Sequence, residues 1–106
     1  MQTPIWPSDA DGDVFRRLAS RGFDFSKVYS IDFNIDFDQW PPSAVAMEAI
    51  RQTFPEAKVY DEEGDGYILF KVSSLLTYEV VVQTQIEATN VASPFGGRCE
   101  SWGVLN

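Results

Sequence analysis

The segment Tyr29–Phe37, with the sequence YSIDFNIDF, constrains the fold of this chain more than any other segment. Large apolar residues alternate in it with polar ones. Successive side chains on a β-strand point to opposite faces of the sheet, so the pattern predicts a half-buried strand. The apolar face carries Tyr29, Ile31, Phe33, Ile35 and Phe37, and the polar face carries Ser30, Asp32, Asn34, Asp36 and, just beyond the strand, Asp38. We expect the first face to form the floor of the core and the second to meet water or a partner.

Three helices and three further strands are predicted around this strand. The helices are expected at 9–21, 43–54 and 78–92, and the strands at 57–61, 67–73 and 98–104. The 62–66 segment, EEGDG, is typical of a hairpin turn between the second and third strands. The 78–92 segment is rich in β-branched residues, which favours a strand, but its length and hydrophobic spacing favour a helix.

This order of elements predicts an α+β fold. Without the first helix it is βαββαβ, the ferredoxin-like sandwich, in which two helices cover one face of a four-stranded antiparallel sheet and the first strand lies between the third and fourth. The extra N-terminal helix fits either at an edge of the sheet or over part of the open face. A length of 106 residues suits a single domain, 1–106, in which residues 1–8, with Pro4 and Pro7, form an extended N-terminal segment.

The charge of the chain narrows the classes of partner. Sixteen acidic and eight basic residues give a formal net charge of −8. Nucleic acid and anionic membrane surfaces are polyanions that such a protein repels, so we expect neither as a direct partner. A basic protein, a cation, or a need for solubility alone fits this charge.

The expected compartment is the cytoplasm. A single cysteine, Cys99, cannot form an internal disulfide. The N-terminal sequence MQTPIWPSD lacks the basic and apolar regions of a signal peptide, and no apolar run approaches the roughly 20 residues that span a bilayer.

Asp32, Asp36 and Asp38 form a candidate docking patch for Lys or Arg side chains of a partner. The alternative is a solvated sheet face, partly neutralised by Lys71 on the neighbouring strand. A second acidic cluster at the hairpin tip is more typical of a soluble turn than of a contact site; it consists of Asp61, Glu62, Glu63 and Asp65.

Candidate apolar anchors for a partner are Tyr67, Leu69 and Trp102, because large side chains, aromatic ones above all, dominate the binding energy of protein interfaces. The alternation in the last strand leaves two placements open for Trp102, on the open face or toward the core.

Neither a metal site nor a catalytic site is expected. The sequence DADGD at 9–13 resembles the start of a calcium loop, but its glycine is fourth rather than sixth and its twelfth residue is Ser20 rather than Glu. Histidine is absent, and the sequence contains no phosphate-binding loop, nucleophile elbow or zinc-ligand spacing. Paired carboxylates could act as acid and base only in a cleft, which a small sheet face does not offer. We therefore expect no enzyme and no cofactor.

Three stretches, in this order and spacing, resemble the regulator of ribonuclease E activity B (RraB) family. They are DGDVFRRLASRGFDFSK, DEEGDGYILF and GGRCESWGV, and the resemblance extends from Asp11 to Val104. It implies an α+β sandwich and a small cytoplasmic protein that binds ribonuclease E and restrains its cleavage of RNA, with no chemistry of its own. A generic protein-interaction or oligomerisation domain with another basic partner is the alternative, and the oligomeric state stays open.

Overall fold

The computed structural model of the protein describes residues 6–62 and 65–104. In these ranges it contains α1 (Ala10–Ser20), β1 (Val28–Phe37), α2 (Ala44–Thr53), β2 (Lys58–Glu62), β3 (Asp65–Leu75), α3 (Tyr78–Ala92), a short 3₁₀ helix η1 (Ser93–Phe95) and β4 (Gly97–Val104). The four strands form one antiparallel sheet in the order β2-β3-β1-β4. The α+β class is thus confirmed, and the first strand lies between the third and fourth, as expected.

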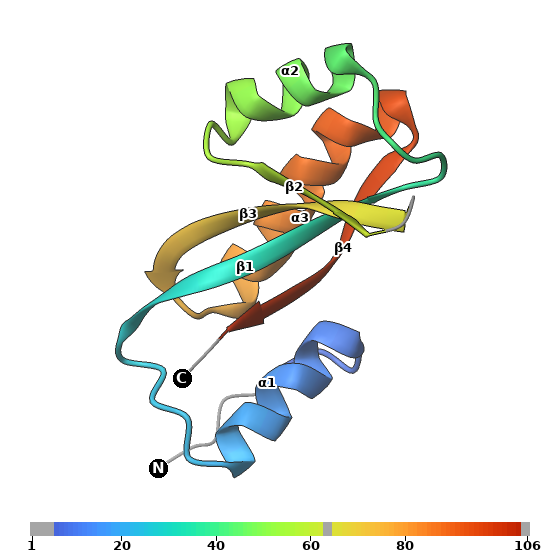
Figure 1. Ribbon diagram of the computed structural model, residues 1–106. Coiled ribbons are helices and arrows are strands. Elements are labelled where there is room, and N and C mark those ends of the chain that lie inside the picture. The colour runs from blue at the N-terminus through green and yellow to red at the C-terminus, as the bar shows by residue number, and fades with distance from the viewer. Residues whose placement is uncertain (1–5, 63–64, 105–106) are drawn as a thin grey trace.

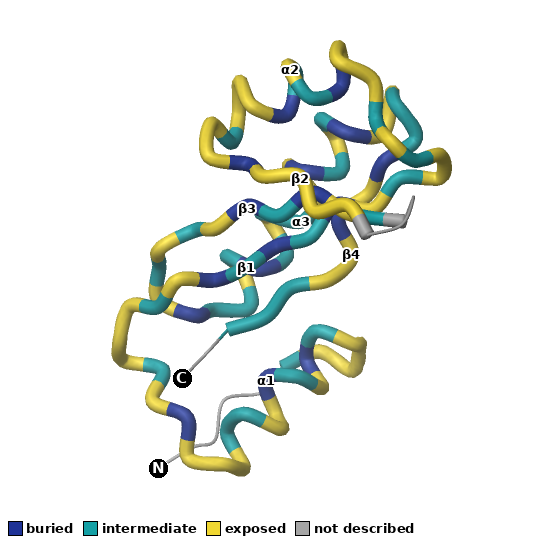
Figure 2. Tube along the Cα trace, viewed as in Figure 1, coloured by how far each residue is buried: buried dark blue, intermediate teal, exposed yellow. Residues whose placement is uncertain are grey.

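The central strand β1 buries its apolar face and leaves its polar face uncovered. Ile31, Phe33 and Ile35 are completely buried, and the burial alternates along the strand (Figure 2). Phe33 lies opposite Phe70 of β3, and their rings stack with centroids 5.3 Å apart. Full burial of each such side chain contributes roughly 1.5–3 kcal/mol, so this face anchors the core.

Helix α3 covers the apolar side of the sheet and contacts β4 and β1. Helices α1 and α2 both pack against α3, and in Figure 1 they lie on opposite sides of it. The sequence left two placements open for α1, at an edge of the sheet or over part of its polar face. The second is excluded, because α1 packs against α3 on the apolar side of the sheet. The polar face stays open.

The α-helices α1, α2 and α3 each begin at a side-chain cap. Asp9, Ser43 and Thr77 accept hydrogen bonds from backbone N–H groups three residues later, as their residue types predict. Helix α3 spans 78–92 as expected, despite its β-branched residues. It buries Val81 and Ala88 against the core, and this tertiary packing outweighs local propensity.

Strand β4 contains a bulge that sets which of its side chains face the core. Asn34 of β1 lies opposite Ser101, but the next residue, Ile35, lies opposite Cys99, so Glu100 is the extra residue. A bulge shifts the alternation of side chains by one. Cys99 and Trp102 therefore both face the helices, although strict alternation would place them on opposite faces.

The acidic cluster predicted at the hairpin tip lies mostly outside the described residues. Residues 63–64 and the side chains of Glu62 and Asp65 are not among them, and only Asp61 is described in full. The strands on both sides of the tip pair as a hairpin, as predicted.

Candidate functional site

The uncovered side of the sheet, called here the open face, brings together most of the predicted binding residues. In the pairing register, Asp32 lies opposite Lys71, Asn34 opposite Leu69, and Asp36 opposite Arg98. The open face consists of Lys58 and Tyr60 of β2, Tyr67, Leu69 and Lys71 of β3, Asp32, Asn34 and Asp36 of β1, and Arg98 and Ser101 of β4. The sequence pattern therefore identified one continuous surface.

Cations partly neutralise the carboxylates on and beside the open face. Lys71 Nζ lies 3.4 Å from Asp32 Oδ1. Arg98 contacts Asp38 at 2.6 Å and Glu100 at 2.8 Å. The hydrogen bond to Asp38 raises the pKa of Arg98, which stays charged. The face therefore carries a mixed charge pattern rather than a purely acidic one.

One end of the open face is aromatic. The rings of Tyr60 and Tyr67 stack with centroids 5.4 Å apart and an angle of 14°, and both side chains are exposed. Leu69 is half-buried beside them, next to a hollow of about 320 Å³. Stacked, exposed tyrosines offer a rigid apolar contact to a partner.

The centre of the open face has an unsatisfied polar atom. The amide nitrogen of Asn34 donates to Ser101 Oγ at 3.3 Å, but its carbonyl oxygen has no hydrogen-bond partner among the described residues. A shielded acceptor of this kind is costly and uncommon in folded proteins.

Trp102 lies on the opposite side of the sheet. It pairs with Phe33 on the helix-covered face, packs its ring against Phe15 of α1 at 5.5 Å, and donates from its indole nitrogen to Asp11 at 2.8 Å. Gln85 of α3 donates to the other oxygen of Asp11 at 3.1 Å. Trp102 thus joins β4 to α1 and is not part of the open face with Tyr67 and Leu69.

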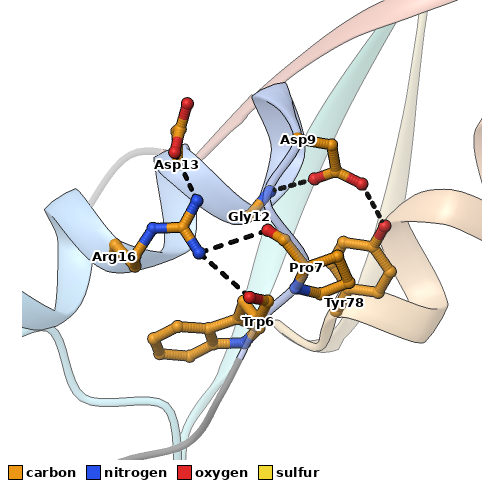
Figure 3. A network of polar contacts seen from close by, with 7 residues as sticks. All are labelled: Trp6, Pro7, Asp9, Gly12, Asp13, Arg16 and Tyr78. Carbon is orange, nitrogen blue, oxygen red and sulfur yellow. Dashed lines mark hydrogen bonds and ion pairs between the residues drawn. The ribbon is translucent and has the colours of Figure 1, made fainter.

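A second polar network, not anticipated from the sequence, lies where the N-terminal segment meets α1 and α3 (Figure 3). Asp9 accepts from the Gly12 N–H at 2.7 Å and from the Tyr78 hydroxyl at 2.5 Å. The Tyr78 bond is the main reason that the pKa of Asp9 lies below its ordinary value, and the same bond raises the pKa of Tyr78 to about 12. Asp9 therefore both caps α1 and ties it to α3.

Residues 6–9 are called here the strap, and Arg16 of α1 also holds them in place. Its guanidinium donates to the carbonyl oxygens of Trp6 at 3.0 Å and Pro7 at 3.1 Å, and it also pairs with Asp13. The Trp6 ring stacks on Phe15 with centroids 5.5 Å apart, so it folds back onto the body of the protein. The strap is thus fixed by both polar and aromatic contacts.

Between the strap and α3 runs a groove of about 720 Å³, the strap groove. Its lining is mostly apolar and comprises Trp6, Pro7, Phe25, Leu76, Thr77, Tyr78, Glu79, Val82 and Gln83. Sequence periodicity could not reveal it, because its walls come from three segments far apart in the chain.

The groups that a catalyst or a metal centre would use are engaged in structural contacts. Both oxygens of Asp9 and of Asp11 accept hydrogen bonds, so the DADGD segment serves packing. Burial is the main cause that raises the pKa of the Cys99 thiol to about 12, which keeps it protonated and unreactive. Within residues 6–62 and 65–104, no group of three His, Cys, Asp or Glu side chains is placed to hold a metal ion.

Comparison with known proteins gives the family. The model of the family described as regulator of ribonuclease activity B matches residues 8–104, nearly the whole chain. The chain belongs to the RraB family. The match covers both the open face and most of the strap groove. No curated protein matches the chain significantly.

The family description names the regulation of ribonuclease activity. In the described part of the chain, every helix is too short or too polar to cross a bilayer.

Proposed function

We propose that this RraB-family protein acts in the cytoplasm, where it binds ribonuclease E and restrains its endonuclease activity, and so slows RNA decay. The observation that supports this is the family match over residues 8–104, whose description is regulation of ribonuclease activity. A net charge of −8 disfavours competition for the RNA itself. The proposal therefore places the regulation in a contact with the ribonuclease protein.

The proposed contact surface is the open face together with Asp38. Asp36 and Asp38 are exposed, and Asp32 is half-buried beside Lys71. Asp36 offers a carboxylate to Lys or Arg of the partner directly, and Asp32 and Asp38 do so in exchange for their pairs with Lys71 and Arg98. Tyr67 and Leu69 supply apolar contact, and Asn34 lies between the strands at the centre of this surface. Charge pairs of this kind speed and orient association more than they add affinity.

The proposed architecture behind this surface is the ferredoxin-like unit. The order β2-β3-β1-β4 supports it, because β1 lies between β3 and β4 and the helices cover one face. An uncovered sheet face is then available for a partner protein.

The test compares two matched charge reversals. The double variant Asp32→Lys/Asp36→Lys changes the open face, and Glu48→Lys/Glu87→Lys makes the same charge change on the exposed sides of α2 and α3. At low salt we expect the first to weaken ribonuclease E binding roughly tenfold and to relieve the inhibition of RNA cleavage, and the second to change both by less than about threefold.

Equal affinity of the two double variants would refute the acidic surface. Failure of the unaltered protein to bind ribonuclease E, with retention of a different basic protein, would instead support the generic interaction domain. Thermal unfolding of both variants controls for the fold.

A further inference from the structure

The strap groove has the apolar floor of a peptide-binding site. Trp6 and Phe25 form one wall, with ring centroids 5.7 Å apart, and Val82 of α3 contributes to the other. Trp6, Phe25 and Val82 are all half-buried, so each keeps apolar surface in contact with solvent. Half-exposed aromatic rings in a concave site are the side chains on which interface hot spots form.

The walls of the groove are held in place before any partner binds. Arg16 holds the backbone of Trp6, the Trp6 ring stacks on Phe15, and the Asp9–Tyr78 hydrogen bond ties the strap to α3. A rigid site loses little conformational entropy on binding, which leaves more of the contact energy for affinity.

The charges around the groove favour a cationic side chain of a partner. Glu79 is exposed at its rim, and Asp9 lies behind Tyr78. The nearby cations are already paired, Arg16 with Asp13 and Lys27 with Asp24. The positive N-terminal end of α3 is offset by the Thr77 cap and by Glu79 in the first turn.

We propose that the strap groove binds a short amphipathic segment of the partner protein that carries both apolar anchors and Lys or Arg residues. The anchors pack between Trp6, Phe25 and Val82, and a cationic side chain pairs with Glu79. This rests on the proposed function and deepens it, since it describes the kind of ribonuclease segment recognised and places a second contact outside the open face.

The test uses a synthetic peptide in which Leu and Arg recur at i, i+3 and i+4 spacing, and a matched peptide with Glu in place of Arg. Calorimetry of the full chain should detect the first and not the second. Glu79→Lys should weaken binding of the first peptide roughly five- to tenfold, whereas the control Glu48→Lys on α2 should leave it within about twofold.

A second variant tests the apolar wall. Val82→Gln places a longer polar side chain in the groove and should weaken the Leu–Arg peptide to a similar degree as Glu79→Lys. Thermal unfolding shows whether either variant has lost its fold, and the Val82→Gln result stands independently of any charge effect.

Ribonuclease E then separates the two proposals. Weaker ribonuclease binding by Glu79→Lys and Val82→Gln supports the groove as a site for the enzyme. If the unaltered protein binds the peptide through the groove but does not bind ribonuclease E, the proposed function is refuted. The groove is then still supported as a peptide-binding site. Full ribonuclease binding by both variants, with no peptide binding, overturns the groove proposal alone. A concentration-dependent dimer that these variants abolish also overturns it, since a second copy would then be the occupant.

Discussion

The open face and the strap groove are two exposed regions that the chain builds in opposite ways. The open face comes from regular alternation along paired strands, and its charges are matched across the sheet, as in Lys71 with Asp32. The groove comes from the strap, the segment around Phe25 and α3, joined by single contacts such as Asp9 with Tyr78. The comparison teaches that local alternation in the sequence reveals an uncovered sheet face, whereas a concave apolar site depends on tertiary contacts.

The largest difference in stability between the strap and the sheet is expected from glycine substitutions. A Cβ at Gly12 would collide with the carbonyl oxygen of Pro7, whereas a Cβ at Gly103, near the open end of β4, would meet nothing within 4 Å. We expect Gly12→Ala to displace the strap and destabilise the protein by about 1–3 kcal/mol, even though Ala favours a helix. Gly103→Ala should change stability by less than about 0.5 kcal/mol.

Chemical denaturation measures the stability of both variants. If Gly12→Ala loses binding of the Leu–Arg peptide and Gly103→Ala does not, the groove depends on the position of the strap. If Gly12→Ala is as stable as the unaltered protein, the strap is not held as the structure describes.

An intermediate effect is expected from pH. Asp9 has a lowered pKa, so its contribution to stability is present above its ordinary value of 3.8 and is lost as the pH falls through the lower folded value. Tyr78 has a raised pKa, so its contribution is present below its ordinary value of 10.0 and is lost as the pH rises through about 12. The contribution of the Asp9–Tyr78 bond to holding the strap should thus be fully present between about pH 4 and 10.

Tyr78→Phe removes the hydroxyl and should abolish the alkaline transition while moving the pKa of Asp9 back toward its ordinary value. Tryptophan fluorescence against pH reports the strap, and NMR titration reports the Asp9 carboxyl. An alkaline transition that persists unchanged in Tyr78→Phe would show that another group causes it.

The smallest effect is expected from Lys71→Ala on the open face. Lys71 is exposed and Asp32 is half-buried, so loss of this pair should cost less than about 1 kcal/mol of stability. The change should nevertheless tighten ribonuclease E binding by about two- to threefold at low salt, since it leaves Asp32 free for the partner. Weaker binding would show that Lys71 itself contacts the partner and would reverse the charge assignment of this face.

Local patterns predicted most of the elements because local chemistry determines them. The alternation in β1 predicted its two faces, and hydrophobic spacing predicted a helix over 78–92, which α3 spans. The predicted strand 67–73 is longer in the structure, at Asp65–Leu75. Its added ends pair with β2 and β1, and such pairing is not visible in local propensity.

The position of Trp102 could not be predicted for a specific reason. The bulge at Glu100 changes the alternation of β4, and a bulge is seen only in the pairing with β1. The hydrogen bonds of Asp11 could not be predicted either, because its partners Gln85 and Trp102 lie 74 and 91 positions away in the chain.

The sequence by itself determined the class of fold, the central strand and the polar character of its outer face, because these follow from side-chain period and capping within a few residues. Only the tertiary structure decided where α1 packs, which face Trp102 occupies, and that a strap and α3 enclose a groove. Those outcomes depend on contacts such as Arg16 with the Trp6 carbonyl and Tyr78 with Asp9, which form only after distant segments are brought together.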